Sequence, residues 1–206
     1  MPQHKFITKQ LIDKGWSEDK KYCLTDEQGK RFLLRVSPIE QYDRKKSEYE
    51  LMSQVATLGV PMCKPLEFGT SDEGVYSIQT WIDGVDVEEN VHNLTCEEQY
   101  SYGFEAGRIL KEIHKIPAPK GIEDWEIYFN RKADRKIKMY EECPIKYENG
   151  QAFIDYINAH RYLLIGRPRT YQHGDYHIGN MMIGNDKQLY IIDFNRNDFG
   201  DPWEEF

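Results

Sequence analysis

Apolar and polar residues alternate along the first eighty residues in a way that predicts a small antiparallel sheet. In "KKYCLTDEQGKRFLLRVS" the alternation predicts strands at 21–25 and 31–36, joined by a turn at 26–29. The stretch "KPLEFGTSDEGVYSIQTWIDG" predicts a second hairpin that turns at "SDEG". Between the hairpins, "SPIEQYDRKKSEYELMSQVATLG" has apolar residues at helical spacing and ends at Gly59. The first part of the chain is therefore expected to be a sheet that carries one helix.

The pattern changes after Gly84, where helical spacing takes over. Thr95 and Glu98 form a capping box, which predicts the start of a helix that runs to about Ile116 and is stopped by the prolines beyond it. Further helical segments and strand-like pieces follow at 125–143, 150–165, "RTYQH", "MMIG" and "LYIIDF". This order predicts an α+β protein of two lobes, 1–83 and 84–206, with a hinge near 81–85. Clefts between lobes are common sites for small ligands.

Composition excludes several classes of protein. Of the 206 residues, 39% are hydrophobic and 30% charged, which is typical of an ordinary globular chain. The chain has no apolar run long enough to cross a membrane and no signal-peptide pattern at its start, so we expect a cytoplasmic protein without a membrane partner. The net charge of -8 disfavours nucleic acid as a partner. The four cysteines form no CxxC pair, which argues against a structural zinc site or a disulfide framework.

The stretch "YQHGDYHIGNMMIGNDKQLYIIDFNRNDFGDP" gathers several groups that carry chemistry. His173 and His177 have the spacing of a helical zinc site, but glycines interrupt the stretch, so zinc is the weaker alternative. Asn180 and Asp193 supply the oxygen ligands that magnesium prefers. Asp175 could accept a proton from an attacking hydroxyl. The interval from Asp175 to Asp193 holds a loop and a hairpin, which would bring the two carboxylates together.

These motifs carry a resemblance to a known family. "HGDYHIGN" is similar to the HGDxxxxN catalytic loop of the aminoglycoside phosphotransferase family, and "IIDF" followed by "GDP" resembles that family's magnesium-binding aspartate and downstream motif. The resemblance covers essentially the whole chain and implies a protein kinase-like bilobal fold. Members of the family normally continue through further helices, so it also implies a C-terminal lobe, and an acceptor site, that is truncated here.

The resemblance implies transfer of the γ-phosphate of ATP or GTP to a hydroxyl of a small molecule, with an aminoglycoside-type antibiotic as the first expectation. Asp175 then resembles the catalytic base, and Asn180 and Asp193 resemble the ligands of Mg²⁺. His173 would brace the loop through a hydrogen bond, and His177 is given no role. Alternatives left open are a kinase of another metabolite or of a macrolide, and a non-catalytic, pseudokinase-like nucleotide-binding protein.

The first lobe contains candidates for the nucleotide site that such a fold requires. Arg35 shares a strand face with Leu33 and stands where the family usually has a lysine for the phosphates, although arginine and lysine are not equivalent. Glu48, on the predicted helix, is the expected partner of Arg35, with Glu50 as the alternative.

Backbone groups complete the predicted nucleotide site. The resemblance implies that amides near Gly15 and Ser17 cover the phosphates and that the backbone of Thr80 and Ile82 bonds the purine. Because the side chains matter little at these positions, the sequence does not separate ATP from GTP.

Overall fold

A computed structural model describes residues 5–13, 19–196 and 198–205 of the chain. By their internal contacts the residues form two compact units, Met1–Ile113 with His173–Asn197 and His114–Gln172 with Asp198–Phe206. The predicted division into lobes at 83/84 stays a prediction.

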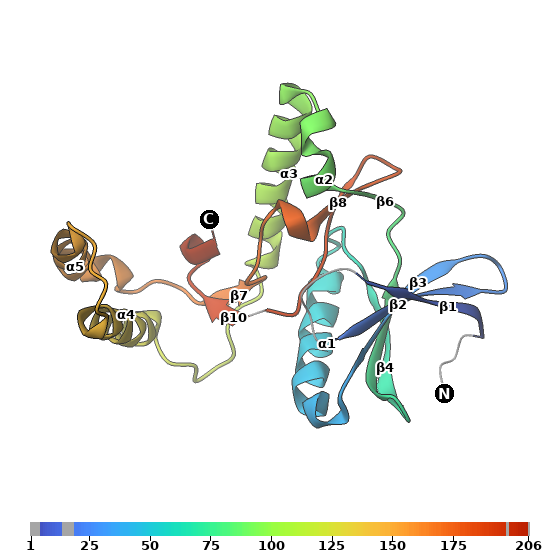
Figure 1. The fold of residues 1–206 in the computed structure, drawn as a ribbon, viewed down its shortest axis with the longest axis horizontal. Helices are drawn as coiled ribbons and strands as arrows, with labels where there is room; N and C mark the ends of the chain where they lie inside the picture. Colours follow the sequence, from blue (N-terminus) through green and yellow to red (C-terminus); the bar gives the residue numbers. More distant parts are fainter. Residues whose placement is uncertain (1–4, 14–18, 197, 206) are drawn as a thin grey trace. The chain divides into compact units, whose positions relative to one another are not determined.

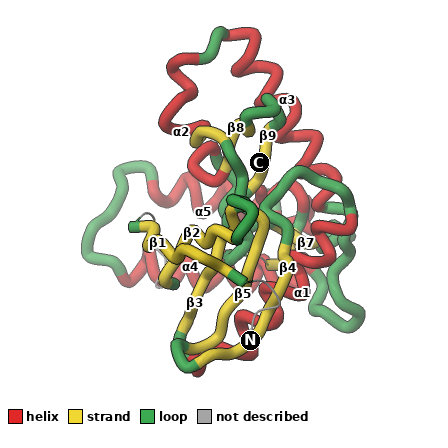
Figure 2. Tube along the Cα trace, turned by 90° about the vertical axis from the view of Figure 1, so that its right-hand side faces the viewer, coloured by secondary structure: helices red, strands yellow, loops and turns green. Residues whose placement is uncertain are grey.

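The first unit contains a five-stranded antiparallel sheet (Figure 1). Its strands lie in the order β1-β2-β3-β5-β4, with bounds β1 Phe6–Ile12, β2 Lys20–Asp26, β3 Arg31–Ser37, β4 Pro65–Ser71 and β5 Gly74–Thr80. The tube in Figure 2 shows β3, β5 and β4 running side by side. Both predicted hairpins, β2 with β3 and β4 with β5, are confirmed.

The alternation along β3 explains how this sheet separates a core from a site. Phe32, Leu34 and Val36 are buried on one side, where they pack with residues of the neighbouring strands. Leu33 and Arg35 point to the opposite side, because successive side chains of a strand alternate between its two faces. Removing the three apolar side chains from water stabilises the sheet by roughly 1.5–3 kcal/mol each, and it holds Arg35 on the other face.

A single helix, α1 (Tyr42–Thr57), follows β3 after a 3-10 turn at Ile39–Gln41. It buries Met52 and Val55, and its Tyr49 ring packs against Phe68 of β4 with the centroids 5.3 Å apart. The helix ends before Gly59, whose positive φ of 74° suits glycine. The predicted sheet with one helix is therefore confirmed.

The rest of the first unit consists of helices and a small second sheet. Its elements are β6 Gly84–Asp86, α2 Val87–Asn90, a 3-10 turn Val91–Asn93, α3 Cys96–Ile113, a 3-10 turn Ile178–Asn180, β8 Met181–Gly184 and β9 Leu189–Ile191. The sheet order is β6-β8-β9. The predicted capping box is confirmed, since Thr95 N–H donates to Glu98 Oε2 at 2.8 Å and Glu98 N–H donates to Thr95 Oγ1 at 3.2 Å.

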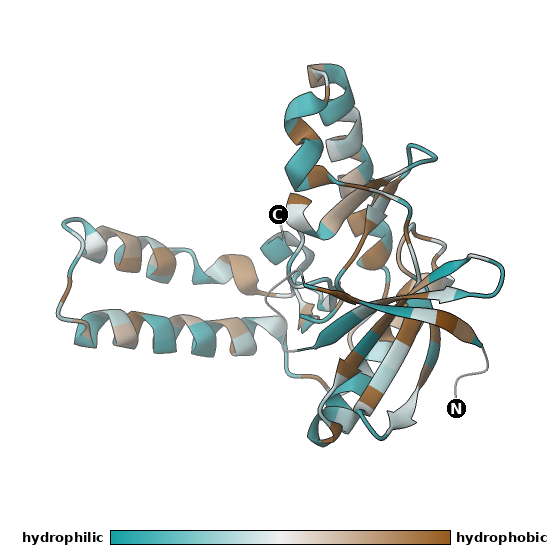
Figure 3. Ribbon diagram, turned by 45° about the vertical axis from the view of Figure 1, so that its right-hand side comes forward, coloured by the Kyte–Doolittle hydropathy of each residue, from teal (hydrophilic) through white to brown (hydrophobic). Residues whose placement is uncertain are grey.

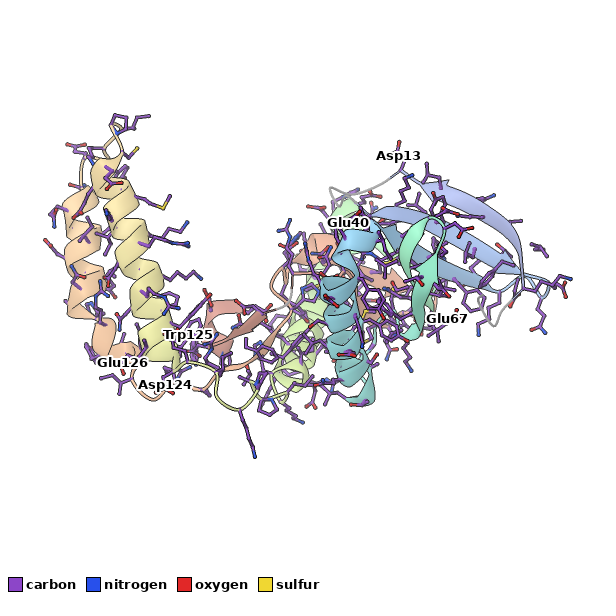
Figure 4. The ribbon with its side chains drawn as sticks, turned by 90° about the horizontal axis from the view of Figure 1, so that it is seen from below. Asp13, Glu40, Glu67, Asp124, Trp125 and Glu126 are labelled. Carbon is purple, nitrogen blue, oxygen red and sulfur yellow. The ribbon has the colours of Figure 1, made fainter. Side chains whose placement is uncertain are left out.

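The second unit is built on a pair of neighbouring helices (Figure 3). Its elements are α4 Trp125–Glu142, α5 Gly150–Ala159, a 3-10 turn Arg161–Leu164, β7 Thr170–Gln172, β10 Asp198–Gly200 and a 3-10 turn Pro202–Glu205. Arg161 ties the pair together by donating to Asn130 at 2.7 Å and to Asp134 at 2.5 Å, both on α4. Trp125, buried at the start of α4, anchors that helix (Figure 4). Among the helices described, none is long and apolar enough to cross a membrane.

Candidate active site

The two histidines of the loop after β7 serve its structure. His173 is fully buried; its Nε2–H donates to the carbonyl oxygen of Ile192 at 2.9 Å, and its Nδ1 accepts the N–H of Asp175 at 3.3 Å. Both ring nitrogens are therefore engaged, which confirms the bracing role and leaves no nitrogen for zinc. The Nδ1 of the more exposed His177 accepts the N–H of Gly179 at 3.1 Å and caps the following turn.

Asp175 is held by hydrogen bonds to both of its carboxylate oxygens. Asn180 Nδ2 donates to Oδ2 at 3.0 Å and to the carbonyl oxygen of Asp175 at 2.9 Å. Arg196 Nη1 contacts Oδ1 at 3.2 Å. The Asp175 side chain is still 27% exposed, so the fixed carboxylate can be reached by another molecule.

Gly174 is required where the loop meets the segment after β9. Its φ is +82°, and a Cβ atom at this position would lie 1.9 Å from the carbonyl oxygen of Arg196. Only glycine permits both the left-handed backbone and this close approach. The glycine therefore brings the Asp175 loop directly against the chain that follows Asp193.

Asp193 is a partly buried carboxylate paired with Arg35. Its φ is +66°, which is rare for a residue other than glycine and typical of functional sites. Arg35 Nη1 donates to its Oδ1 at 2.6 Å. Burial alone would raise the pKa of Asp193, but the positive charges of Arg35 and Lys21 outweigh burial and lower it, so the group is ionised at neutral pH.

Asp193 and Asn180 line one open cavity of about 540 Å³ in the first unit, together with Arg35, Lys21 and residues 80–84. The amide nitrogen of Asn180 is used by Asp175, which leaves its amide oxygen for another partner. Among the described residues, nothing donates to Asp193 Oδ2 either. These hard oxygen donors fit Mg²⁺, which keeps waters and substrate phosphates as its other ligands. Among the described residues, no cluster of three or more His, Cys, Asp or Glu side chains could hold a metal ion.

Arg35 belongs to a buried charge cluster that the sequence did not reveal. Its Nε and Nη2 donate to Asp19 Oδ2 at 3.3 and 3.1 Å. Asp19 also accepts from Ser37 Oγ at 2.6 Å and from Lys45 Nζ at 2.9 Å. Burial alone would raise the pKa of Asp19, but the hydrogen bond from Ser37 and the charges of Arg35 and Lys45 lower it.

The prediction that Arg35 forms an ion pair with Glu48 is wrong. Glu48 instead accepts from Arg44 Nε at 2.8 Å and pairs with Lys45 Nζ at 3.1 Å. Asp19 lies beside Arg35 because it directly precedes β2, the strand that pairs with β3. Lys45 of α1 contacts both Asp19 and Glu48. The alternative, Glu50, is an exposed residue whose Oε1 lies 4.0 Å from Lys46 Nζ.

The remaining predicted residues were expected to bind the nucleotide through their backbone groups. Thr80 and Ile82 line the same cavity as Asp193. The Thr80 amide already donates to the Lys64 carbonyl oxygen at 2.9 Å, so only the Thr80 carbonyl is left for a purine. Gly15 and Ser17 lie outside the described residues.

Sequence reasoning missed five side chains of the site: Asp19, Lys21, Lys45, Gln79 and Arg196. The register of β2 on β3 and the position of α1 bring three of them to the site, and neither could be read from the sequence: Asp19, Lys21 and Lys45. Gln79 is buried near the end of β5. A glutamine within a strand does not by itself indicate a functional site. Arg196 could have been considered from the sequence, because it lies only two residues after the "IIDF" motif.

Comparisons with known proteins place the chain in a family. A family model described as the phosphotransferase enzyme family matches residues 9–206. A search of curated proteins finds no significant match.

Solved structures share the fold at low sequence identity. The ADP-bound aminoglycoside phosphotransferase APH(2'')-Ib is 18% identical with a TM-score of 0.68, over 96% of this chain and 69% of that one. The macrolide 2'-phosphotransferase MphH from Brachybacterium faecium is 15% identical with a TM-score of 0.67, over 98% and 71%. The streptomycin–ATP complex of APH(2'')-IIa is 18% identical with a TM-score of 0.63, over 96% and 68%.

The predicted fold is thus confirmed, as is the resemblance on which it rested. The chain belongs to the phosphotransferase enzyme family and is by that membership a small-molecule kinase.

Proposed function

We propose that this protein transfers the γ-phosphate of ATP or GTP to a hydroxyl group of a small molecule, with Asp175 as the catalytic base. One observation carries the proposal: Asn180 contacts the Asp175 carboxylate and also lines the cavity that holds Asp193 and Arg35. A proton acceptor and a phosphate-binding cavity thus adjoin within the first unit. In this reading, 1–83 acts as the nucleotide-binding lobe and 84–206 as the catalytic lobe.

The reaction assigns one bond-making and one bond-breaking event to the γ-phosphorus. The acceptor oxygen bonds to this phosphorus while the bond to the β–γ bridging oxygen breaks and the nucleoside diphosphate leaves. The hydroxyl proton passes to Asp175, whose carboxylate is oriented by Asn180 and Arg196. These hydrogen bonds fix the orientation of the carboxylate, so the base requires no reorientation during the reaction.

Asp193 and Asn180 would hold magnesium, since their oxygens face the same cavity. When bound, the ion neutralises charge on the phosphates. Arg35 holds Asp193 in place through its 2.6 Å contact. The Thr80 carbonyl and the Ile82 backbone would bond the purine, and Gly15 and Ser17 would cover the phosphates.

An aminoglycoside-type antibiotic is the acceptor that the relatives favour. The solved structures include aminoglycoside phosphotransferases in complex with streptomycin and gentamicin, and nucleotide complexes with ATP, ADP and GDP. A macrolide is the next choice because a macrolide phosphotransferase shares the fold. The supply of ATP and GTP inside the cell makes the cytoplasm the expected compartment.

A screen of nucleotide consumption tests the proposal. The purified protein is incubated with Mg·ATP or Mg·GTP and with aminoglycosides, macrolides or metabolite alcohols, and acceptor phosphorylation is followed by mass spectrometry. We expect phosphorylation of at least one acceptor. Nucleotide binding without transfer to any acceptor would favour the pseudokinase-like alternative, which the arginine in place of the usual lysine makes worth testing. Absence of nucleotide binding would contradict both.

A further inference from the structure

Among the described residues, three positively charged side chains line the cavity that holds Asp193, and two of them are already paired. Arg31 forms an ion pair with Asp83, which lies between β5 and β6. The guanidinium group of Arg35 donates hydrogen bonds to Asp19 and Asp193. The residue at the position expected to bind phosphate is therefore committed to two carboxylates.

Lys21 is the third cation, and it lies beside Arg35. In the register of β2 on β3 the two residues are directly opposite (Figure 1 shows the neighbouring strands), so both side chains project from the same face of the sheet. Lys21 lines the cavity together with Asp193 and Asn180. Within the described part of the chain, its ammonium group forms no ion pair and no hydrogen bond.

The surroundings of Lys21 favour an anionic ligand. Its side chain is half-buried, and burial, reinforced by the positive charge of Arg35, lowers its pKa even though Asp193 and Asp19 act in the opposite direction. A partly desolvated ammonium without a bonded anion is a costly arrangement. A phosphate group in the cavity would supply the missing charge-assisted hydrogen bonds.

We propose that Lys21 binds the phosphates of the nucleotide and that Arg35 is a positioning residue for Asp193, so the lysine of the site comes from β2 rather than β3. The inference rests on the proposed function, because it presupposes that the cavity takes a nucleotide. It explains how the chain can have arginine at position 35 and still offer an ammonium group to the phosphates.

The test compares Lys21→Met with Lys20→Met. Lys20 is the adjacent residue of β2, exposed and on the opposite face, so the same substitution there is a matched control. Dissociation constants are measured by calorimetry for Mg·ATP, for Mg·GTP and for adenosine and guanosine, which lack phosphates. Thermal denaturation establishes that each variant is folded.

We expect Lys21→Met to weaken binding of the triphosphate about ten- to hundredfold, as loss of a hydrogen bond to a charged group does, and to leave nucleoside binding unchanged. Lys20→Met should change neither. Lys21→Arg, which keeps a charged donor, should retain affinity within a few fold and keeps the test open if the methionine variant is unstable.

Unchanged triphosphate affinity in Lys21→Met would overturn the inference, and so would equal losses of affinity for triphosphate and nucleoside. An arginine variant as weak as the methionine variant would also contradict it. If the parent protein binds neither Mg·ATP nor Mg·GTP, the proposed function fails as well, whereas parent binding that survives Lys21→Met removes only the role of Lys21.

Discussion

The loop that carries Asp175 and the charged cluster around Arg35 are built by opposite means. In the loop, Asp175 and Asn180 are five positions apart and bond each other directly. In the cluster, Arg35 reaches Asp193 across 158 positions and Asp19 across 16. A short motif specifies the loop geometry, while the cluster depends on strand register and on where α1 lies.

Burial separates the two regions as well. The side chains of Asp19, Arg35 and Lys45 are 4%, 11% and 13% exposed, against 27% for Asp175. Removing one partner from a buried charge cluster leaves another charge uncompensated, which costs several kcal/mol. The loop is therefore expected to govern the rate of the reaction, and the cluster to govern stability and nucleotide binding.

The largest effect is expected from Asp175→Asn. The amide keeps the shape of the side chain but cannot take a proton, so phosphate transfer should fall by about 10²- to 10⁴-fold while nucleotide affinity stays close to that of the parent. Steady-state kinetics and calorimetry measure the two quantities. Asp72→Asn, the same change in the exposed turn between β4 and β5, is the control and should transfer phosphate at the parental rate. Parental transfer by Asp175→Asn would remove this residue as the base.

Gly174→Ala should destabilise the protein more than Gly29→Ala. Both glycines have similar positive φ values, +82° and +80°, but a Cβ at Gly29 meets nothing within 4 Å, whereas at Gly174 it meets a carbonyl oxygen at 1.9 Å. We expect a loss of about 1–2 kcal/mol at Gly29 from backbone strain alone and a clearly greater loss at Gly174. Urea denaturation measures both, and equal losses would show that the loop is not held against Arg196.

Asp19→Asn should lower the free energy of unfolding by about 3 kcal/mol at neutral pH, and Glu48→Gln by less. The pKa of Asp19 is lower in the folded state, so its contribution is complete above the ordinary value of 3.8 and is lost as the pH falls through the folded-state pKa. The difference between parent and Asp19→Asn should therefore narrow below about pH 4. Urea denaturation across this range measures it. A larger loss for Glu48→Gln would mean that Glu48, not Asp19, is the main partner in the cluster.

The smallest effect concerns two cysteines and leaves function unchanged. Burial raises the pKa of Cys63, which lines the cavity, to about 12, whereas Cys96 is exposed at the start of α3. Since the thiolate is the reactive form, iodoacetamide at about pH 8 should label Cys96 and spare Cys63. Peptide mass spectrometry reads out both sites, and rapid labelling of Cys63 would show that the cavity wall opens in solution.

Much of the fold was predictable because local patterns are consistent with it. Alternation predicted the two hairpins, and the capping box at Thr95 and Glu98 formed as expected. The helix predicted over 150–165 instead ends at Ala159 and continues as a 3-10 turn. Such ends depend on small differences in hydrogen bonding, which periodicity does not resolve.

In the candidate site, too, the residues of a local motif were predicted and the contacts between distant residues were not. Asp175, Asn180 and Asp193 were predicted from one motif. In the structure, Asn180 donates to Asp175 and lines the same cavity as Asp193. The Arg35–Glu48 pair was predicted by analogy with kinases and is replaced by Arg35–Asp19. Lys21 was not considered, since its closeness to Arg35 follows from strand pairing alone.

By itself, the sequence determined the identity of the reactive groups and the local shapes that present them: the glycine at 174, the amide at 180, and the alternation that places Arg35 away from the core. Only the tertiary structure decided which charges meet. A buried ion interacts strongly only with groups a few ångströms away, and those distances are determined by strand register and helix packing. Asp19 and Lys21 therefore lie beside Arg35 although no motif connects them to it.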